Sequence, residues 1–361
     1  MTVKGNDAPA ALGVGRVPNR HGAARSWGRG LGATALVAVL LSGVGWAQDT
    51  VFFRVGGGPS DGSYFGVATL IAKVISNPPG SPTCEEGGSC GVPGLIAAAV
   101  STEGSAENVA AVAAGRLESA LAQTNVVSWA YNAAGPYQGK PRLTNIAAIA
   151  NLFPESVHVV VRADSGIRTV RDLKDKRVSL GPKGSGTASD ARLILEAYGV
   201  PLKSVKASYL ATGPAADLLG TGEIDALFTV AAYPMVAIDE LAKTADVRLL
   251  ALDGKEAGRL AKKHPYYSFG VIPRGSYQGV GDTMTVTVSA QLIVMKNAPE
   301  ELVYGITRAL WHERSRALLD RGAPEGRRIR IENALLGVGI PLHPGASRFY
   351  REIGAATRPT P

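Results

Sequence analysis

Residues 177–199 read RVSLGPKGSGTASDARLILEAYG, which has the pattern of a strand, a glycine-rich loop and a helix in succession. Residues 177–180 form the strand, GPKGSGT (181–187) is the loop, and residues 188–198 have a helical pattern that Gly199 ends. The same unit occurs at residues 50–75, around the loop GGGPSDGS (56–63), and at residues 95–114, around STEGS (101–105). Short strands that alternate with helices predict an α/β protein with mainly parallel strand pairing.

Two domains are expected from the length of the chain and from its interruptions. The 361 residues exceed one ordinary core. One boundary is expected near residues 153–158, where a proline interrupts two apolar strands, and a second near residues 264–273. The first domain then combines residues 48–153 with residues 274–361, and the second holds residues 154–273. Near the end, residues 283–295 predict a strand and residues 299–319 one helix that starts with Pro299.

An export signal is expected at residues 1–47. Five Lys or Arg residues precede the short apolar run 31–44, and Gly45-Trp46-Ala47 places small residues where a signal peptidase reads them. The run is shorter than the roughly 20 residues of a bilayer span, although a retained N-terminal anchor stays as the alternative to cleavage. Residues 1–47 carry +4 of the net charge of +8. The remainder is weakly basic without a basic stripe, so nucleic-acid binding is not expected.

The two cysteines, Cys84 and Cys90, lie in the segment PTCEEGGSCGVPG (82–94). In an exported protein, a close pair within a Gly/Pro-rich loop predicts a local disulfide, with two free thiols as the alternative. A zinc site is not expected, because no histidine stands beside the pair in the sequence. The histidines are scattered without ligand spacing, so we expect neither a metal nor a cofactor.

Small hydroxyl residues stand at the starts of the three predicted helices. They are Ser60 and Ser63, Thr102 and Ser105, and Ser185 and Thr187. A helix start has unpaired N–H groups and the positive end of the helix dipole, and glycine allows a ligand to approach the backbone. Three such starts at the carboxyl ends of parallel strands would together bind an anion. The alternative is that each hydroxyl only caps its own helix.

One enzyme motif matches the sequence. Residues 58–62 read GPSDG, a G-x-S-x-G sequence between a strand and a helix, and Asp225 and His264 or His312 follow Ser60 in the order of a hydrolase triad. A hydrolase fold needs earlier strands to supply its second oxyanion donor, whereas this is the first strand after the export signal. A secreted serine hydrolase therefore stays as the alternative to a protein that is not an enzyme. Nucleotide binding is not expected, because GPKGSGT lacks the ending of a phosphate loop.

Six stretches carry a family likeness. They are STEGSAEN (101–108), ALAQTNVVSWAY (120–131), NLFPESVHVVVR (151–162), VRDLKDKRVSLGPKGSGT (170–187), GEIDALFTVAAYP (222–234) and IPRGSY (272–277). In this order they resemble the TAXI family, the solute receptors of a branch of tripartite ATP-independent periplasmic (TRAP) transporters, over nearly all of the chain after residue 47.

The resemblance implies a periplasmic binding protein-like type II fold, with two α/β lobes joined by hinge strands and a ligand cleft between them. It also implies a periplasmic receptor that captures a small carboxylate, such as glutamate or 2-oxoglutarate, and delivers it to membrane permease subunits. A ligand-sensing receptor for a membrane signalling partner is the alternative within this fold.

Carried over by position, the resemblance implies ligand binding by residues of the helix-start loops, of one strand end and of a late loop. They are Ser60, Ser63, Tyr64, Thr102, Ser105, Asn108, Gln123, Ser185, Gly186, Thr187 and Tyr233. Two acids depart from the loops of the family, Asp61 in GGGPSDGSYF (56–65) and Glu103 in STEGS. Glu103 is counted among the expected binding residues. We expect that Glu103 or Asp61 pairs with an amine of the ligand, which would favour a zwitterion over a dianion. The alternative is that both acids face solvent.

Overall fold

The computed structural model describes residues 50–355, so the predicted export segment lies outside the described residues. The strands are β1 (Val51–Gly56), β2 (Ser76–Asn77), β3 (Val92–Pro93), β4 (Leu95–Val100), β5 (Ser119–Gln123), β6 (Ile146–Arg162), β7 (Arg177–Ser179), β8 (Lys206–Ser208), β9 (Ala226–Ala231), β10 (Val247–Leu249), β11 (Ser268–Ile272) and β12 (Thr283–Met295). The helices are α1 (Ser63–Ile75), α2 (Ser105–Ala113), α3 (Thr124–Asn132), α4 (Gly186–Ala197), α5 (Thr212–Gly220), α6 (Val236–Thr244), α7 (Gly254–Lys263), α8 (Glu300–Leu310), α9 (Glu313–Arg321) and α10 (Pro344–Glu352).

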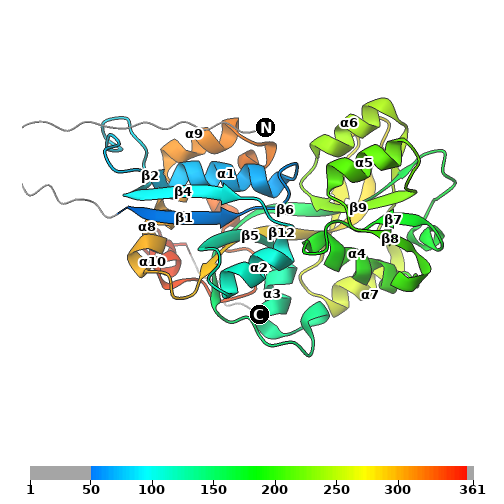
Figure 1. Ribbon diagram of the computed structural model, residues 1–361, viewed down its shortest axis with the longest axis horizontal. Helices are drawn as coiled ribbons and strands as arrows, with labels where there is room; N and C mark the ends of the chain where they lie inside the picture. Colours follow the sequence, from blue (N-terminus) through cyan, green and yellow to red (C-terminus); the bar gives the residue numbers. More distant parts are fainter. Residues whose placement is uncertain (1–49, 356–361) are drawn as a thin grey trace, which may run out of the picture. The chain divides into compact units, whose positions relative to one another are not determined.

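One mixed sheet runs through the described residues in the order β4-β1-β5-β12-β6-β9-β7-β8, with β10 also paired to β6 and β11 to β12 (Figure 1). At one end β4, β1 and β5 are parallel and the antiparallel β12 follows; at the other end β8, β7 and β9 are parallel and the antiparallel β6 follows. We call these ends, with their helices, the first half and the second half. The predicted α/β class is confirmed, and the doubled arrangement is that of a periplasmic binding protein-like type II fold. The two antiparallel insertions make the sheet mixed, where mainly parallel pairing was expected.

Strand β6 does not stop at its proline, which corrects the expected interruption. It continues for 17 residues, pairing with β12 up to Ser156 and with β9 from Ser156 onward. Proline cannot donate to a sheet ladder and is accepted mainly at edges and bulges. Here Pro154 is exposed and lies close to a register shift between β6 and β12, at Ala290/Gln291. The sheet therefore connects the two halves without a break.

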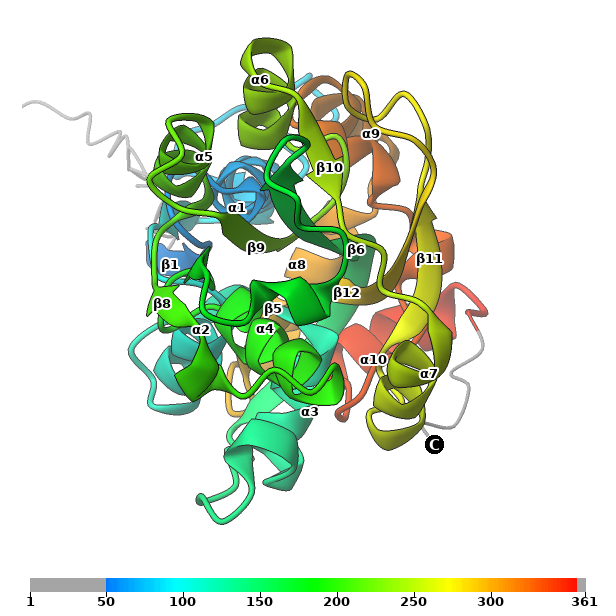
Figure 2. The same cartoon turned by 90° about the vertical axis from the view of Figure 1, so that its right-hand side faces the viewer.

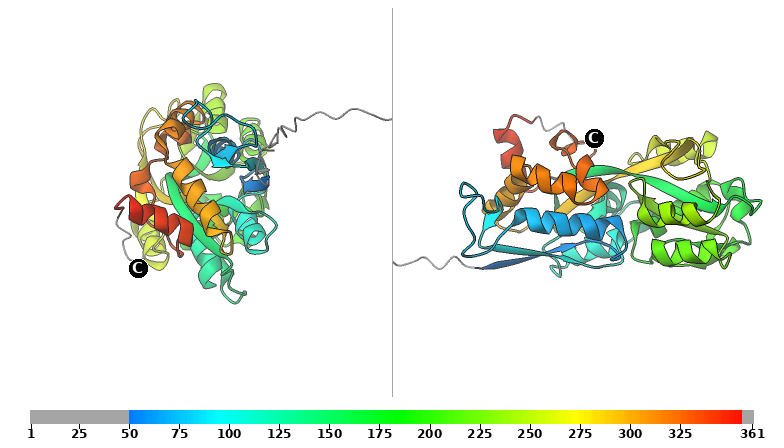
Figure 3. Two further views of the ribbon diagram at one scale, coloured as in Figure 1. Left: turned by 90° about the vertical axis from the view of Figure 1, so that its left-hand side faces the viewer. Right: turned by 90° about the horizontal axis from the view of Figure 1, so that it is seen from above.

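Helices cover both faces of the sheet in each half. In the first half, α1, α8, α9 and α10 share one apolar core, and α2 and α3 pack on the opposite face. Helices α8 and α9 pack beside α1, and α10 packs on α8 (Figure 3). In the second half, α5 and α6 form a separate core on one face, and α4 and α7 cover the other (Figure 2). No helix within residues 50–355 is both long enough and apolar enough to cross a membrane.

The helix expected at residues 299–319 is two helices, α8 and α9, with a break at Trp311 and His312. The His312 side chain accepts a hydrogen bond from the backbone N–H of Arg314 at 3.2 Å and so caps α9. The Trp311 indole donates to the Tyr350 hydroxyl of α10 at 2.9 Å. The break therefore follows from a side-chain cap and a tertiary contact, neither of which the helical pattern shows.

A buried amide fixes the loop edge of the first half. Asn108 of α2 is fully buried and donates through Nδ2 to the carbonyl oxygens of Gly57, after β1, and of Leu121, in β5. Its side chain thereby joins two neighbouring strands at the end where the helix-start loops begin.

Replacing Asn108 should destabilise the protein through the backbone. In Asn108→Ala, the Leu121 carbonyl loses this donor and the Gly57 carbonyl keeps that of the Thr102 hydroxyl. Loss of such buried hydrogen bonds typically costs about 1–3 kcal/mol. Urea unfolding should show a free energy of unfolding that is lower by that amount, and therefore a lower midpoint. An unchanged midpoint would mean that the amide does not hold β1 and β5 together.

Candidate ligand-binding site

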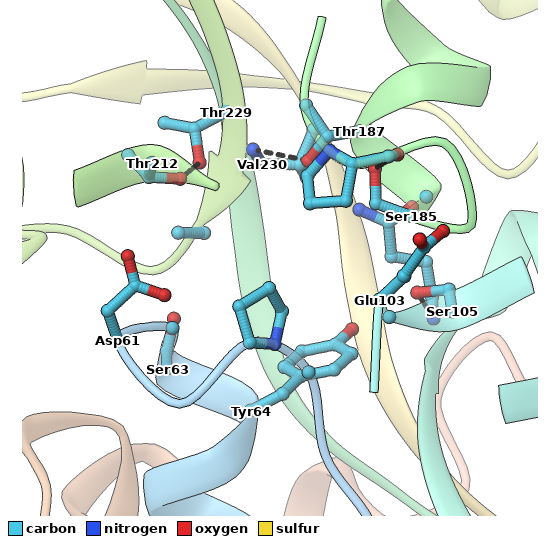
Figure 4. Close-up of a pocket in the computed structure, with 18 of the residues that line it drawn as sticks. Asp61, Ser63, Tyr64, Glu103, Ser105, Ser185, Thr187, Thr212, Thr229 and Val230 are labelled. Carbon is cyan, nitrogen blue, oxygen red and sulfur yellow. Dashed lines mark hydrogen bonds between the residues drawn. The ribbon is translucent and has the colours of Figure 1, made fainter. Parts of the chain in front are cut away.

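A cavity of about 70 Å³ lies where the loops after β1, β4 and β7 meet the starts of four helices. Its lining combines residues of the first half, around the starts of α1 and α2, with residues of the second half, around the starts of α4 and α5 and the end of β9 (Figure 4). The lining side chains include hydroxyls, one amide and two carboxylates, and none of the described lining residues is Lys, Arg or His. The space suits one small molecule or several waters.

The starts of α1 and α4 offer free backbone amides to this cavity. Helix α1 follows Gly62, which has no side chain to cap it, and the N–H groups of Ser63 and Tyr64 have no acceptor within the described residues. At α4, the Ser185 hydroxyl accepts only from Ala188 N, at 3.0 Å, so the N–H groups of Gly186 and Thr187 are likewise without a partner in residues 50–355. Unpaired amides at the positive ends of two helix dipoles attract a negative charge.

The starts of α2 and α5 are satisfied differently. The N–H groups of Ala106 and Glu107 in α2 both donate to the carbonyl of Gly184, in the second half, at 3.0 Å. At α5, the N–H of Gly213 donates to the Asp61 carboxylate of the first half at 3.1 Å. The first residues of these two helices, Ser105 and Thr212, also line the cavity, and their N–H groups have no acceptor within residues 50–355. The starts of α2 and α5 are thus partly bonded to the opposite half, whereas those of α1 and α4 are not.

Gln123 supplies a second, independent sign of a polar ligand. It ends β5, is 3% exposed, lines the cavity, and its Oε1 has no hydrogen-bond partner in the described part of the chain. A Cβ atom on Gly186 would lie 1.7 Å from that oxygen, so glycine at the start of α4 lets Gln123 approach. Because Gln123 also lines the cavity, this oxygen is placed to accept from a donor on a ligand.

Two buried carboxyl groups lie near the cavity. The Tyr64 hydroxyl donates to Glu155 of β6 at 2.5 Å, and Asp190 of α4 accepts from Asn125 at 2.6 Å and from Tyr267 at 2.5 Å. Burial raises the pKa of Glu155 to about 8 and the pKa of Asp190 to about 7. Near neutral pH these groups hold protons to a large extent, which limits the negative charge beside a site that offers amides to an anion.

A model described as the NMT1-like family matches residues 55–354. The chain belongs to the NMT1-like family. The matched residues include every residue that lines the cavity.

Solved structures of low identity are also similar to this NMT1-like chain. The alkanesulfonate-binding protein SsuA from Xanthomonas axonopodis pv. citri, bound to MOPS, is 16% identical over 87% of this chain and 86% of that chain, with a TM-score of 0.41. The periplasmic aliphatic sulphonate binding protein SsuA from Escherichia coli is 15% identical over 86% and 84%, with a TM-score of 0.39. An ancestral arginine-binding protein bound to arginine is 16% identical over 72% and 90%, with a TM-score of 0.40. Likeness at this level assigns no ligand to the chain.

The cavity of this NMT1-like protein brings together two-thirds of the residues that the sequence pointed to. The lining includes Ser63, Tyr64, Glu103, Ser105, Gln123, Ser185, Gly186 and Thr187. Several are already bonded within the protein: the Ser105 hydroxyl accepts from Gln123 N at 3.0 Å, and the Thr187 hydroxyl accepts from Val230 N at 3.2 Å. Their side chains shape the site, while the free amides belong to the backbone.

The remaining predicted residues do not line the cavity. Ser60 is exposed, and Asn108 is committed to two strands of the sheet. The Thr102 hydroxyl donates to Gly57 O at 3.0 Å and accepts from Gly104 N at 3.2 Å. The ring of Tyr233 packs against the Arg328 guanidinium, which lies 4.6 Å from the ring centre.

The sequence reasoning did not select three residues at the site, Thr212, Thr229 and Glu155. The hydroxyls of Thr212 and Thr229 are 3.0 Å apart at the cavity wall (Figure 4). Thr212 starts α5 in ATGPAAD (211–217), where a small residue, glycine and proline were a usable sign of a helix start. Glu155 was visible as an acid within the apolar run 151–162.

The candidate partners of Ser60 in a hydrolase triad are engaged elsewhere. Asp225 forms an ion pair with Arg177 at 2.6 Å, and the His264 ring packs edge-on against Trp129. His312 caps α9. These placements do not assemble a base and an orienting acid around Ser60.

The predicted disulfide between Cys84 and Cys90 is confirmed, with Cα atoms 4.7 Å apart. The expectation that no histidine neighbours the pair holds only along the sequence. In space, His312 Nε2 lies 3.9 Å from Cys84 Sγ, although 228 residues separate the two. Both sulfur atoms are held in the disulfide and are not available as thiolate ligands.

Stability should fall as pH rises from 6.5 to 8.5. Between the ordinary pKa of about 4.3 and its raised pKa, folded Glu155 holds a proton that the unfolded chain releases, and Asp190 acts in the same direction. Burial lowers the pKa of His158 to about 4 and also lowers the pKa values of His264 and His343. The opposite trend that these histidines cause fades above their ordinary pKa of about 6.5.

The protein lacking residues 1–47 should therefore have a lower Tm at pH 8.5 than at pH 6.5, and Glu155→Gln should reduce this difference. The amide of Gln can still accept from the Tyr64 hydroxyl, so the variant isolates the titration. Equal Tm differences in the wild type and the variant would contradict the assignment.

Proposed function

We propose that the protein is an extracytoplasmic receptor that captures a small carboxylate in the cavity between its two halves. The observation that carries the proposal is the set of unpartnered groups on that cavity: the amides of Ser63 and Tyr64, the amides of Gly186 and Thr187, and the buried oxygen of Gln123. Two helix starts from opposite halves bind one anionic group better than either does alone, because each contributes N–H donors and a favourable dipole.

The lining narrows the ligand to a molecule with little net charge beyond one anionic group. Donors to a carboxylate come from the backbone, and the described lining has no cationic side chain that would balance a second negative charge. The unpartnered Gln123 oxygen calls for a ligand donor such as an amine or hydroxyl. An amino acid such as glutamate fits this pattern better than a 2-oxo dicarboxylate of the same skeleton.

The role in transport is supported by the resemblance to the TAXI family. On that ground the receptor works in the periplasm and passes its ligand to the permease subunits of a TRAP transporter. The two halves would act as lobes, 48–153 with 274–361 and 154–273, that close by bending of the long strands β6 and β12.

A thermal-shift screen of the protein lacking residues 1–47 tests ligand capture. L-glutamate, 2-oxoglutarate, other amino acids and dicarboxylates are added, and mass spectrometry identifies what co-purifies. A true ligand stabilises the folded state by about 2.7 kcal/mol at a hundredfold excess over Kd. If no compound shifts the Tm and nothing co-purifies, the capture role is contradicted.

Gly186→Ala should weaken binding of any ligand found in this way. The new methyl group would lie 1.7 Å from Gln123 Oε1, so Gln123 must move and the amide of residue 186 is displaced from the site. Titration calorimetry should show affinity at least about tenfold weaker, which corresponds to roughly 1.4 kcal/mol.

Gly258→Ala is the matched control, because it lies in α7 and has open space around the added Cβ. Its affinity should equal that of the wild type. Wild-type affinity in Gly186→Ala would remove the start of α4 from the site.

A further inference from the structure

The two acids that depart from the family loops, Asp61 and Glu103, both reach across the cavity to the other half of the molecule. Asp61 precedes α1, and its Oδ2 accepts from the N–H of Gly213, the second residue of α5, at 3.1 Å. Glu103 precedes α2, and its Oε2 accepts from the N–H of Gly184, in the loop before α4, at 2.6 Å. Figure 4 shows the two carboxylates on different sides of the cavity.

Both acceptor carboxylates meet a glycine, and in both places the missing side chain makes room for the acid. A Cβ atom on Gly213 would lie 2.8 Å from Asp61 Oδ2, and one on Gly184 would lie 2.7 Å from Glu103 Oε2. Neither glycine has a positive φ angle, so the backbone conformation does not require glycine there. Glycine is required at these positions because the opposite half approaches the backbone closely.

The contacts also complete helix starts that lack caps of their own. Helix α5 follows Ala211, which provides no side-chain cap, and Asp61 supplies a carboxylate from the other half. Helix α2 follows Gly104, also without a side-chain cap, and its Ala106 and Glu107 amides donate to Gly184 O. Gly184 thus accepts two hydrogen bonds through its carbonyl and donates one through its N–H. Each half leaves helix groups unsatisfied that only the opposite half satisfies.

We propose that Asp61 and Glu103 are positioning residues that close the cleft, and that they act on the ligand only by holding the two halves around it. This inference rests on the proposed receptor function for its effect on affinity. Each contact is a charge-assisted hydrogen bond at an exposed position, so its loss should lower the ratio of closed to open molecules about three- to tenfold. Because the acids do not touch the ligand, affinity for every ligand should fall by the same factor.

Closure can be measured without any ligand. Spin labels on Lys73→Cys of α1 and Asp217→Cys of α5, both exposed positions, report the distance between the halves in the protein lacking residues 1–47. The native cysteines are joined in a disulfide and do not compete for label. The wild type should contain a closed population, and this population should shrink in Asp61→Asn with Glu103→Gln.

Gly213→Ala and Gly184→Ala should shrink the closed population as well, although they keep both charges. The control Glu332→Gln removes an exposed acid of the first half and should leave the distances unchanged. Identical distance distributions in the wild type and in the acid and glycine variants would overturn the proposal.

The second experiment measures, by titration calorimetry, the affinity of each variant for L-glutamate and for 2-oxoglutarate. Each single variant should weaken both compounds by the same factor, about three- to tenfold. If Asp61→Asn or Glu103→Gln changes the ratio of the two affinities while the glycine variants do not, the acids contact the ligand amine and the proposal fails. If neither compound binds the wild type, the proposed ligand class is wrong, and the spin-label distances still decide the closing role.

Discussion

Backbone amides that have no acceptor within residues 50–355 are the constraint on which this cavity depends. Those of Ser63 and Tyr64 begin α1 in the first half, and those of Gly186 and Thr187 begin α4 in the second. Unpaired N–H groups are costly where they are buried unless water or a ligand accepts from them. The remaining features are consistent with an acceptor at this place: Gln123 lies beside α4, no cation competes in the lining, and the buried acids nearby are partly neutral.

The same shortage of caps at helix starts has two different outcomes in this molecule. At α2 and α5 the opposite half of the chain provides the acceptor, through Gly184 O and the Asp61 carboxylate. At α1 and α4 no group of the described chain does so. On the proposed function, contact between the halves satisfies part of the starts of α2 and α5 and leaves the starts of α1 and α4 for a ligand. Both long strands, β6 and β12, remain continuous across the junction, which allows such closure by bending without loss of sheet bonds.

Much of this organisation follows from local sequence patterns. The strand–loop–helix units and the strand 283–295 were predictable, since apolar periodicity and glycine loops act over a few residues. So were the loops that form the site, because strand ends gather at one edge of a sheet. The continuity of β6 through Pro154 was not predictable, because it depends on a register shift between β6 and β12. The break between α8 and α9 was not predictable either, because it depends on the contact of Trp311 with Tyr350.

The individual roles of the site residues depended on partners far along the chain. Thr102 and Asn108 have residue types suited to ligand binding, yet their polar groups hold the backbone of Gly57 and Leu121. Asp61 and Glu103 are exposed acids by sequence, but their partners lie 152 and 81 residues away. These carboxylates reach the glycine amides only in the folded chain, so a local sequence pattern does not predict the two contacts.

A crystal structure of the protein lacking residues 1–47 with its bound ligand tests the account most directly. The account predicts an anionic group of the ligand within hydrogen-bond distance of the Ser63 or Tyr64 amide and of the Gly186 or Thr187 amide, in contact with both halves. A ligand held elsewhere, or one whose anionic group pairs with a cationic side chain while these amides bind only water, would contradict it.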